Sequence, residues 1–460
     1  MYFPLTTITL RLSHVDPLML YRMLGKGRDY CALLESATHE GGSDYSFLAL
    51  GNRDVVTVRE GRITGSHFVS DGTIRDPLES FDHLMERKHD ADRLHMGYIG
   101  FLSYESARFF ENIQLQPDLH VPDAHFFLPE VLVRIDHCRD EVSLIAHADT
   151  HEDLKAIKRM ILQSSEQPVK QRPDSFVRNV DADRRFRRMT AGKEYESAVE
   201  DAKEKIQAGE VFQVVLSQEL ELPMVDPVLV FEHLRALNPS PYMYLFRTPE
   251  LTIVGASPET LIRIEGDKVL YRPIAGTRKR TGDESKDRML RNELLSDEKE
   301  RCEHQMLVDL GRNDVGRIAA VGSVEVRNAF RIEAYAHVYH IVSDIVARLR
   351  EDKTPLDALR AVFPAGTLTG APKVRAMEII RDTENAPRGI YGGAFGYIDL
   401  SGDIDFAIMI RSMLFADHVT LRVGAGIVTD SVPEREDQEC MNKARSCLLA
   451  VANALSSSAS

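Results

Sequence analysis

Two pairs of glutamates, each pair three residues apart, have the types and spacing to do chemistry. Glu300 and Glu303 lie in the acidic stretch 297–314, and Glu436 and Glu439 lie near the C-terminus. Residues three apart on a helix face the same way, so each helix would present two carboxylates together. One such pair alone is typical of a solvated acidic face. Two helices that meet can instead build a site of oxygen ligands, which suits Mg²⁺ better than zinc or iron.

The stretches that carry these pairs both have the pattern of amphipathic helices. In residues 297–314 acidic side chains occupy the first turn, and we expect Ser296 as the N-cap and Gly311 as the helix end. Four positions should form its buried stripe: Cys302, Met306, Leu307 and Leu310. The second helix should begin at Ser431, with Pro433 in its first turn. Five residues should line its core-facing side: Cys440, Ala444, Cys447, Leu448 and Val451.

A series of short motifs in a fixed order accompanies the two helices. They are Gly-Ala-Ser-Pro-Glu-Thr at 255–260, Arg-Pro-Ile-Ala-Gly-Thr-Arg at 272–278, a histidine at 340, Thr-Leu-Thr-Gly-Ala-Pro-Lys at 367–373, Tyr-Gly-Gly-Ala-Phe-Gly at 391–396, Asp-Phe-Ala-Ile-Met-Ile-Arg at 405–411 and Gly-Ala-Gly-Ile at 424–427. Together they resemble the chorismate-utilising enzymes, and among these the anthranilate synthase component I family. The resemblance is strong over 195–451 and looser before it.

The resemblance implies a large α+β fold, in which two antiparallel sheets pack on each other with helices outside and the active site in a cleft. The predicted elements agree, because strands come in runs with helices interspersed and short connections imply antiparallel pairing. We divide the chain into a β-rich N-terminal region over 1–165, a polar linker over 166–190, a chorismate-binding catalytic region over 191–455 and a disordered tail over 456–460.

The reaction that the resemblance implies begins with amination of chorismate at C2 and loss of the C4 hydroxyl, and elimination of pyruvate then gives anthranilate. The ring carboxylate needs a cation, and the resemblance implies Mg²⁺ held by Glu303 and Glu439. Glu300 and Glu436 would support these ligands or bind the ion through water. Plain helix surface stays open as the alternative for these two outer residues.

Two residues are expected to take part in proton transfer. Glu259 matches the family's general acid for the leaving hydroxyl, and a glutamate beside other carboxylates in a cleft holds its proton tightly enough to act near neutral pH. His340 would lie near the ring and assist proton transfer or departure of the leaving group. A lone histidine in a strand is otherwise typical of a protein core.

The resemblance also implies the residues that hold the substrate. A planar guanidinium suits the enolpyruvyl carboxylate, and Arg411 fits that role. The same end would be bound by Tyr391 and by the backbone amides of Gly424, Ala425 and Gly426. Gly276 and Thr277 would hold the ring end, and we place Thr367 among the substrate-binding residues. Lys373 and Lys443 would add positive potential, with a helix cap or a salt bridge as the open alternative for both.

Two positions favour anthranilate as the product. Relatives that add water to chorismate carry a lysine base where this chain has Gln213, and an amide cannot take a proton from water. Relatives that make aminodeoxychorismate carry lysine where this chain has Ala275. Aminodeoxychorismate synthase component I remains the alternative function. A metabolite-binding protein without catalysis is a second alternative, against which the complete set of site residues counts.

Two distant motifs predict a regulatory site for tryptophan. Leu-Leu-Glu-Ser at 33–36 and Asn-Pro-Ser-Pro-Tyr-Met at 238–243 resemble the two halves of the family's inhibitor site. Six residues are the expected contacts: Glu35, Ser36, Asn238, Pro241, Tyr242 and Met243. Glutamate and serine supply polar groups, and proline, tyrosine and methionine supply an apolar wall for the indole. A core strand and a simple turn are the alternative interpretation of the two motifs.

Composition limits the remaining function classes. The chain has 460 residues and a net charge of −14 without a basic cluster, which disfavours nucleic-acid binding. Its five cysteines show no Cys-x-x-Cys spacing, and it shows no signal peptide or membrane-spanning stretch, so we expect a cytoplasmic protein. No cysteine lies in the Gly-x-Cys-x-Gly turn of glutamine amidotransferases. Ammonia should therefore come from a separate glutamine amidotransferase subunit in a hetero-oligomer.

Overall fold

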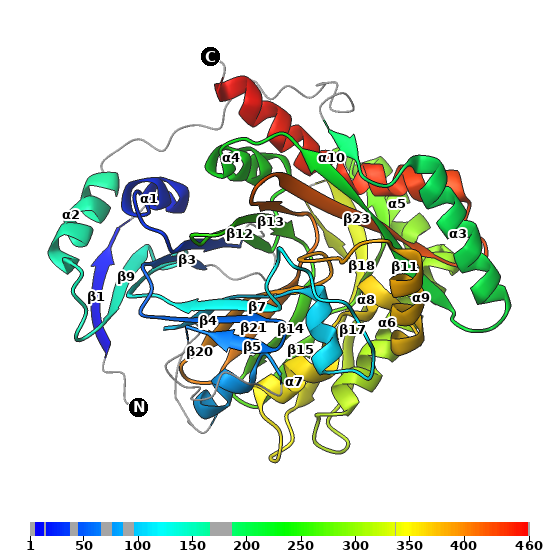
Figure 1. Cartoon of the computed structure of the whole chain (residues 1–460), viewed down its shortest axis with the longest axis horizontal. Coiled ribbons are helices and arrows are strands. Elements are labelled where there is room, and N and C mark those ends of the chain that lie inside the picture. Colours follow the sequence, from blue (N-terminus) through cyan, green and yellow to red (C-terminus); the bar gives the residue numbers. More distant parts are fainter. Residues whose placement is uncertain are drawn as a thin grey trace.

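A computed structural model gives the fold of the chain (Figure 1). It describes residues 5–12, 15–36, 45–65, 76–85, 96–165, 186–335 and 337–458. Of the expected linker, residues 166–185 lie outside this part, and residues 187–188 form a short strand. The last helix continues to Ser458 and so enters the expected tail, of which residues 459–460 are not described.

Two large antiparallel sheets form the molecule, as predicted. The first sheet runs in the order β1 (Leu5–Arg11), β9 (Glu141–His147), β8 (Val131–Asp136), β3 (Tyr45–Leu50), β2 (Cys31–Glu35), β12 (Tyr242–Arg247), β13 (Thr252–Ser257), β22 (Ser412–Phe415), β23 (Val419–Ile427), β11 (Gln213–Leu222) and β10 (Arg187–Arg188), with β19 (Gly370–Ala371) also on β11. The second runs β16 (Ile274–Lys279), β18 (Val338–Arg348), β15 (Lys268–Tyr271), β14 (Thr260–Glu265), β21 (Ile404–Ile408), β20 (Ala394–Asp399), β6 (Gly97–Leu102), β7 (Ala124–Leu128), β4 (Asp54–Arg59) and β5 (Arg62–Thr64), with β17 (Glu325–Ala334) on β18. Strands from the N-terminal region and from the catalytic region stand in both sheets.

The helices lie outside the two sheets, which confirms the α+β class. They are α1 (Pro17–Leu24), α2 (Leu154–Ser165), α3 (Gly192–Gln207), α4 (Pro227–Leu237), α5 (Glu284–Ser296), α6 (Glu298–Gly316), α7 (Pro355–Val362), α8 (Gly366–Thr369), α9 (Lys373–Thr383) and α10 (Pro433–Ser458), with 3₁₀ turns η1 (Glu79–Leu84) and η2 (Tyr104–Phe109). In Figure 1, α4 and α10 lie along one side of the molecule, where they pack on β13 and β23. Among the described helices, none is both long and apolar enough to cross a membrane.

Successive side chains along strands of the first sheet pack alternately into two separate hydrophobic cores. In β12, Tyr244 and Phe246 pack into the core shared with the second sheet, whereas Met243 and Leu245 pack into the core beneath the outer helices. A strand that is buried on both faces has a continuous run of apolar residues in its sequence, and β12 has this pattern. The two sheets therefore stack closely, and strands distant in sequence come to lie beside one another.

The acidic helix α6 differs in detail from the sequence prediction. Asp297, not Ser296, is its N-cap, because the Asp297 carboxylate accepts the Glu300 N–H and Ser296 belongs to the preceding helix. The helix does not end at Gly311 but continues to Gly316. Gly311 is required for close approach, since a Cβ there would lie 2.5 Å from the Tyr271 ring.

The predicted buried stripe of α6 is correct for Leu307 and wrong for its other three residues. Cys302 is exposed, and Met306 and Leu310 are half-buried. The buried positions are His304, Leu307, Val308, Gly311, Asp314 and Val315. Polar residues join this stripe because they find partners in the core: the His304 ring lies 2.7 Å from the Ser343 hydroxyl, and Asp314 pairs with Lys373 at 2.8 Å. In α10, by contrast, all five predicted core residues are buried.

Candidate active site

Glu259 lies in the tight turn between β13 and β14, at the point where the chain passes from one sheet to the other. Its backbone N–H donates to the Ser257 hydroxyl at 3.3 Å, and its carbonyl accepts the Ile408 N–H at 3.0 Å, which fixes the turn. The side chain is buried, and burial raises the pKa of the carboxyl to about 7 against the opposing effects of Thr367, Lys443 and Arg411. The structure thus brings three other predicted residues near the Glu259 carboxyl, which holds its proton near neutral pH.

Arg411 is a half-buried cation, and the described part of the chain offers it no anionic partner. It follows β21 in a left-handed backbone conformation, with φ of +51°, that is costly for a residue with a Cβ. Within the described part of the chain, no carboxylate comes within salt-bridge distance of its guanidinium. Burial lowers its pKa, and Glu259 is near enough to act on it in the opposite direction. A half-buried guanidinium without a carboxylate partner among the described residues is a suitable site for a carboxylate from outside the protein.

His340 on β18 is held as a neutral ring. Its Nδ1 lies 2.7 Å from the Gly276 carbonyl oxygen and 3.2 Å from the Thr277 hydroxyl. A carbonyl only accepts, so Nδ1 carries the proton and Nε2 is left as an acceptor. Burial lowers the pKa of the ring to about 4. Gly276, at φ of +65°, lies in the irregular register between Ala275 and Arg278 that turns its carbonyl toward the histidine.

The glycines of β23 let the Tyr391 hydroxyl approach the sheet. A Cβ at Gly424 would lie 2.5 Å from that hydroxyl, and a Cβ at Gly426 would lie 2.4 Å from the Gln213 amide nitrogen. Ala425 between them faces the core beneath the helices. The Lys443 ammonium donates to the Gly424 carbonyl at 2.9 Å. Tyr391, Gly424 and Lys443 are therefore neighbours, as the sequence predicted.

Charge interactions link the glutamates of α6 and α10, with Glu303 acted on by Glu300 and Glu439, and Glu436 by Glu439. Burial raises the pKa of Glu303, and the negative charges of Glu300 and Glu439 add to this. Burial and Glu439 likewise raise the pKa of Glu436. Four carboxylates that repel one another in this way favour a cation between them.

The glutamates are partly engaged by cations of the chain itself. Glu439 pairs with Lys443 at 2.8 Å, and Glu300 pairs with Arg278 at 3.2 Å. As positioned, no three histidine, cysteine, aspartate or glutamate side chains of the described residues could together hold a metal ion. Hard carboxylate oxygens fit Mg²⁺, which also keeps waters and substrate oxygens as ligands. The donor set therefore fits Mg²⁺ only together with ligands from outside the protein.

The two predicted halves of the inhibitor site come together in the first sheet. Glu35 at the end of β2 stands opposite Met243 of β12. The Glu35 carboxylate is buried and pairs with Arg235 of α4 at 3.2 Å, while its Oε2 has no hydrogen-bond partner. Burial raises its pKa to about 7. Asn238 ends α4, and its buried side-chain nitrogen also lacks a partner.

The remaining residues of that site border these polar groups. Ser36 and Pro241 are half-buried. The Tyr242 hydroxyl donates to Asp405 at 2.7 Å and lies 3.1 Å from the hydroxyl of Thr260, the residue after the buried acid. The strand of the inhibitor motif is thus hydrogen-bonded directly to the turn that carries Glu259.

Sequence reasoning missed two residues of the candidate active site. The Tyr335 ring meets the His340 ring edge-on, with centroids 5.1 Å apart, and Tyr335 acts on the pKa of Arg411. The Arg388 guanidinium lies over the Tyr391 ring, 5.6 Å from its centroid. Nothing in the sequence around Tyr335 signals its role, whereas Arg388 lies three residues before Tyr391. Lys373 forms a buried ion pair with Asp314, so the salt-bridge alternative describes it.

Comparison with known proteins agrees with this arrangement. The chorismate binding enzyme family matches residues 29–449. The chain is 41% identical to anthranilate synthase component 1 of Aquifex aeolicus, covering 95% of this chain and 92% of that one. It is also 41% identical to anthranilate synthase component 1 of Thermus thermophilus, covering 95% of each.

Solved structures show the same fold. Anthranilate synthase component I from Streptococcus pneumoniae superposes with a TM-score of 0.77 at 33% identity, covering 94% of this chain and 97% of that one. The menaquinone-specific isochorismate synthase of Escherichia coli, at 19% identity and a TM-score of 0.73, covers 98% of this chain and 95% of that one and shares the fold. The chain therefore belongs to the chorismate-binding enzymes, in the anthranilate synthase component 1 family.

Proposed function

We propose that this chain is the large subunit of an anthranilate synthase that converts chorismate and ammonia to anthranilate and pyruvate in the cytoplasm. The observation that carries the proposal is that Arg411 and Glu259 lie near each other in the site. Arg411 is an unpaired cation, and Glu259 is a carboxyl with its pKa raised to about 7. Chorismate needs both a cation for a carboxylate and a proton for a departing hydroxyl.

Each half of the substrate has a matching group in the site. The Arg411 guanidinium binds the enolpyruvyl carboxylate, together with the Tyr391 hydroxyl and the backbone of residues 424–426. Glu259 donates its proton to the C4 hydroxyl as that group leaves. The proton is available because burial keeps the carboxyl neutral up to about pH 7. His340 is neutral, and its Nε2 accepts a hydrogen bond from the substrate ring.

Glu303 and Glu439 would hold Mg²⁺, with Glu300 and Glu436 beside them. When bound, the ion neutralises the ring carboxylate of chorismate and so assists the loss of the hydroxyl. Lys443 holds Glu439 in the structure and also donates to Gly424. This lysine therefore links the glutamate cluster to the carboxylate-binding end of the site.

Two neighbours of the site favour ammonia as the nucleophile. The Gln213 amide nitrogen lies 3.5 Å from Glu303, and its carbonyl oxygen is buried without a partner. An amide at this position cannot generate hydroxide, so addition of water to the ring is disfavoured. Ala275 offers no amine beside the ring. Ammonia from glutamine would come from an amidotransferase partner subunit, since the chain lacks the turn that carries that enzyme's nucleophilic cysteine.

Tryptophan would bind beside the paired ends of β2 and β12, near Glu35 and Asn238, and inhibit from a distance. The unpartnered oxygen of Glu35 suits the ligand ammonium, and the unpartnered amide of Asn238 suits its carboxylate. Occupation of this site would shift Tyr242 and, through its bonds to Asp405 and Thr260, the turn of Glu259. Inhibition would then reflect a bias between two states and not competition at Arg411.

Product analysis tests the catalytic proposal. The purified chain is supplied with chorismate, Mg²⁺ and ammonium, and anthranilate fluorescence and released pyruvate are measured together. We expect equal amounts of both, and no product when glutamine replaces ammonium without a partner subunit. Accumulation of aminodeoxychorismate without pyruvate would assign the chain to the alternative reaction. Tight chorismate binding without turnover would show a binding protein.

The regulatory proposal has a direct optical test, because the chain contains no tryptophan. Fluorescence anisotropy of added tryptophan therefore reports its binding without background from the protein. Ser36→Leu should abolish the anisotropy change and the inhibition while activity remains. Ser296→Leu, at an exposed helix end, is the matched control. Unchanged tryptophan sensitivity in Ser36→Leu would refute the site.

A further inference from the structure

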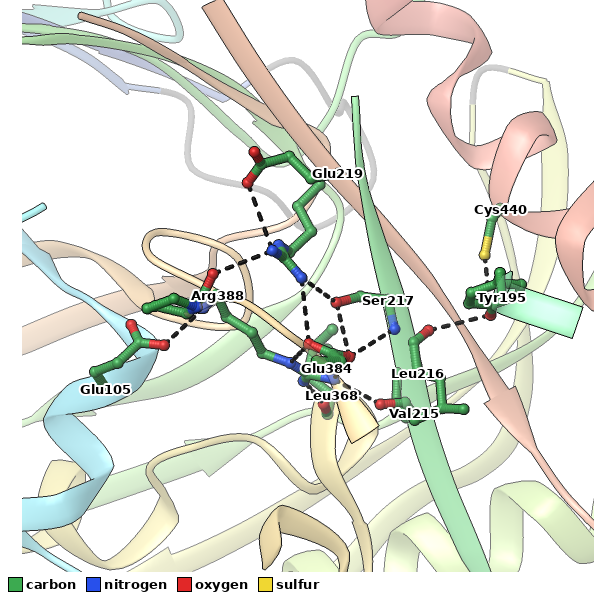
Figure 2. Close-up of polar contacts among 12 residues, drawn as sticks. Glu105, Tyr195, Val215, Leu216, Ser217, Glu219, Leu368, Glu384, Arg388 and Cys440 are labelled. Atoms are coloured by element: carbon green, nitrogen blue, oxygen red, sulfur yellow. Dashed lines mark hydrogen bonds and ion pairs between the residues drawn. The ribbon is translucent and has the colours of Figure 1, made fainter. Parts of the chain in front are cut away.

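A buried pair of opposite charges takes the place of a strand along one edge of β11. That edge pairs with β19 at Gln213 and Val214 and with β10 at Leu220 and Glu221. Between them, no strand of the described residues pairs with it. The Arg388 guanidinium donates to the Val215 carbonyl at 2.6 Å, and the Glu384 carboxylate accepts the Ser217 N–H at 2.7 Å (Figure 2). These two side chains therefore satisfy backbone groups that a strand would otherwise satisfy.

Four of the five N–H donors of the Arg388 guanidinium are bonded within the protein. It donates to the Leu368 carbonyl at 2.7 Å, to the Val215 carbonyl, and to both carboxylate oxygens of Glu384 at 2.9 and 2.6 Å. Its side chain is 2% exposed. Having no free donor directed to solvent, Arg388 does not bind substrate itself.

Further contacts keep the Glu384 carboxylate of this pair ionised. The Glu384 carboxylate also pairs with Arg422 at 3.2 Å and accepts the Ser217 hydroxyl at 3.0 Å. Burial alone would raise the pKa of Glu384, but Arg388, Arg422 and the Ser217 N–H outweigh it and lower the pKa. The carboxylate is therefore ionised, and the guanidinium keeps its counter-charge in the interior.

The segment that carries Arg388 is fixed at its backbone as well. The N–H groups of Arg388 and Gly389 donate to the two carboxylate oxygens of Glu105 at 2.7 and 3.0 Å, as Figure 2 shows in part. Gly389 has φ of +58°, a conformation that glycine adopts without strain. Two residues later comes Tyr391, whose ring lies under the same guanidinium.

Three elements of the candidate site meet at this one cation. Leu368 follows Thr367, and Thr367 lies beside Glu259. The Leu368 carbonyl is near the end of the four-residue helix α8, where carbonyl groups lack partners within the helix. Val215 stands opposite Gly426 in the sheet. Tyr391 contacts Gly424. Arg388 thus connects Thr367, which is beside the proposed general acid Glu259, with Tyr391 and the glycines of β23, which are expected to bind the enolpyruvyl carboxylate.

We propose that Arg388 is a positioning residue that sets the distance between Thr367, Tyr391 and the glycines of β23, and so the affinity for chorismate. The inference rests on the proposed function for the roles of those residues. A planar fork is needed, because lysine carries one compact ammonium that cannot reach two carbonyls and a carboxylate in fixed directions. A residue that served stability alone would lower the melting temperature without changing the KM of the folded enzyme.

The test compares Arg388→Lys with Arg422→Lys. Both arginines are buried and share Glu384, but Arg422 bonds to the Pro387 carbonyl, the Ser217 hydroxyl and Glu219, and not to the Leu368 or Val215 carbonyl. For Arg388→Lys we expect the KM for chorismate to rise about tenfold, the size of one or two lost charge-assisted hydrogen bonds. Hydrogen exchange should accelerate at residues 366–370. Arg422→Lys should lower thermal stability while the KM stays near the wild-type value.

Several outcomes would overturn the proposal. An unchanged KM in folded Arg388→Lys would do so, and so would equal rises in KM in both variants, which would show a general packing effect. If Arg388→Lys does not fold, Ser217→Ala removes one hydroxyl that is bonded to Glu384 and Arg422, and it should give a smaller rise in KM and faster exchange at 366–370. No change in either quantity would reject the idea. Arg411→Lys separates the two claims, because a normal KM in that variant refutes the proposed site and not the role of Arg388.

Discussion

Glu259 and Glu384 are both buried glutamates, yet their surroundings give them opposite protonation states. Glu384 meets two arginines, a serine hydroxyl and a backbone N–H, and its pKa is lowered. Glu259 has weaker opposing influences, and burial raises its pKa to about 7. Burial therefore does not determine the charge of a carboxyl, because the donors around it decide.

The difference separates a region that holds the structure from one that is available for chemistry. Around Glu384 nearly every donor and acceptor has a partner. Around Glu259, the Arg411 guanidinium has no carboxylate partner among the described residues, and the Thr367 hydroxyl is buried without a hydrogen-bond partner. Unmatched buried groups cost stability, and they are typical of sites that are completed by a ligand.

The largest effect is expected from removing the proton of Glu259. Glu259→Gln should lower kcat by a factor of about 10² to 10⁴, the usual contribution of a general acid, with chorismate binding retained. Glu265→Gln, at the exposed end of β14, which follows the turn of Glu259, is the control and should stay active. Anthranilate fluorescence gives the rate, and a kcat within twofold of wild type would remove Glu259 from the mechanism.

Removing Glu384 should affect stability in the first place. Glu384→Ala leaves two buried arginines without their shared anion and should cost about 3–5 kcal/mol in the free energy of unfolding. Glu200→Ala breaks an exposed pair with Lys203 and should cost less than about 1 kcal/mol. Urea unfolding followed by circular dichroism measures both. Equal costs would mean that the Glu384 cluster contributes no more than a surface ion pair.

The glutamates of α6 and α10 have surroundings intermediate between those of Glu384 and those of Glu259. Glu303 is partly buried, and burial together with the neighbouring carboxylates raises its pKa. A bound cation would offset this repulsion. Glu303→Gln should raise the Mg²⁺ concentration needed for half-maximal activity by about tenfold to 100-fold. Glu298→Gln, exposed on the same helix, should leave it unchanged. Full wild-type activity in excess chelator would exclude the metal site.

The smallest expected effect is on the pH dependence of stability. Between the ordinary pKa of 4.5 and the folded value of about 7, the folded chain keeps the Glu259 proton that the unfolded chain has lost. Stability therefore falls as pH rises through this window. From about pH 5.5 to about pH 6.5, the free energy of unfolding of wild type should fall by about 1.4 kcal/mol more than that of Glu259→Gln. Parallel pH profiles from urea unfolding would contradict the raised pKa.

The sequence predicts well what local pattern and motif order can encode. The fold class followed from the resemblance, and the buried stripe of α10 followed from helical spacing. The sequence-based predictions were wrong where contacts between residues distant in sequence determine the local structure. Gly311 has the pattern of a helix end, but the structure requires it for the packing of Tyr271. The position of Arg388 just before Tyr391 is visible in the sequence, but its partners Val215 and Leu368 lie in other elements and are not. Protonation states were likewise beyond the sequence, since they depend on which donors the fold brings to each carboxyl.

A carboxyl titration of the wild-type chain tests the contrast between Glu259 and Glu384 most directly. Glutamate side chains labelled with ¹³C at the carboxyl carbon are followed by NMR across the pH range, and Glu259→Gln and Glu384→Gln assign the two resonances. The account predicts that the Glu259 signal titrates with a pKa of about 7 and that the Glu384 signal titrates below its ordinary 4.5. A Glu259 signal that titrates at or below 4.5 would contradict it.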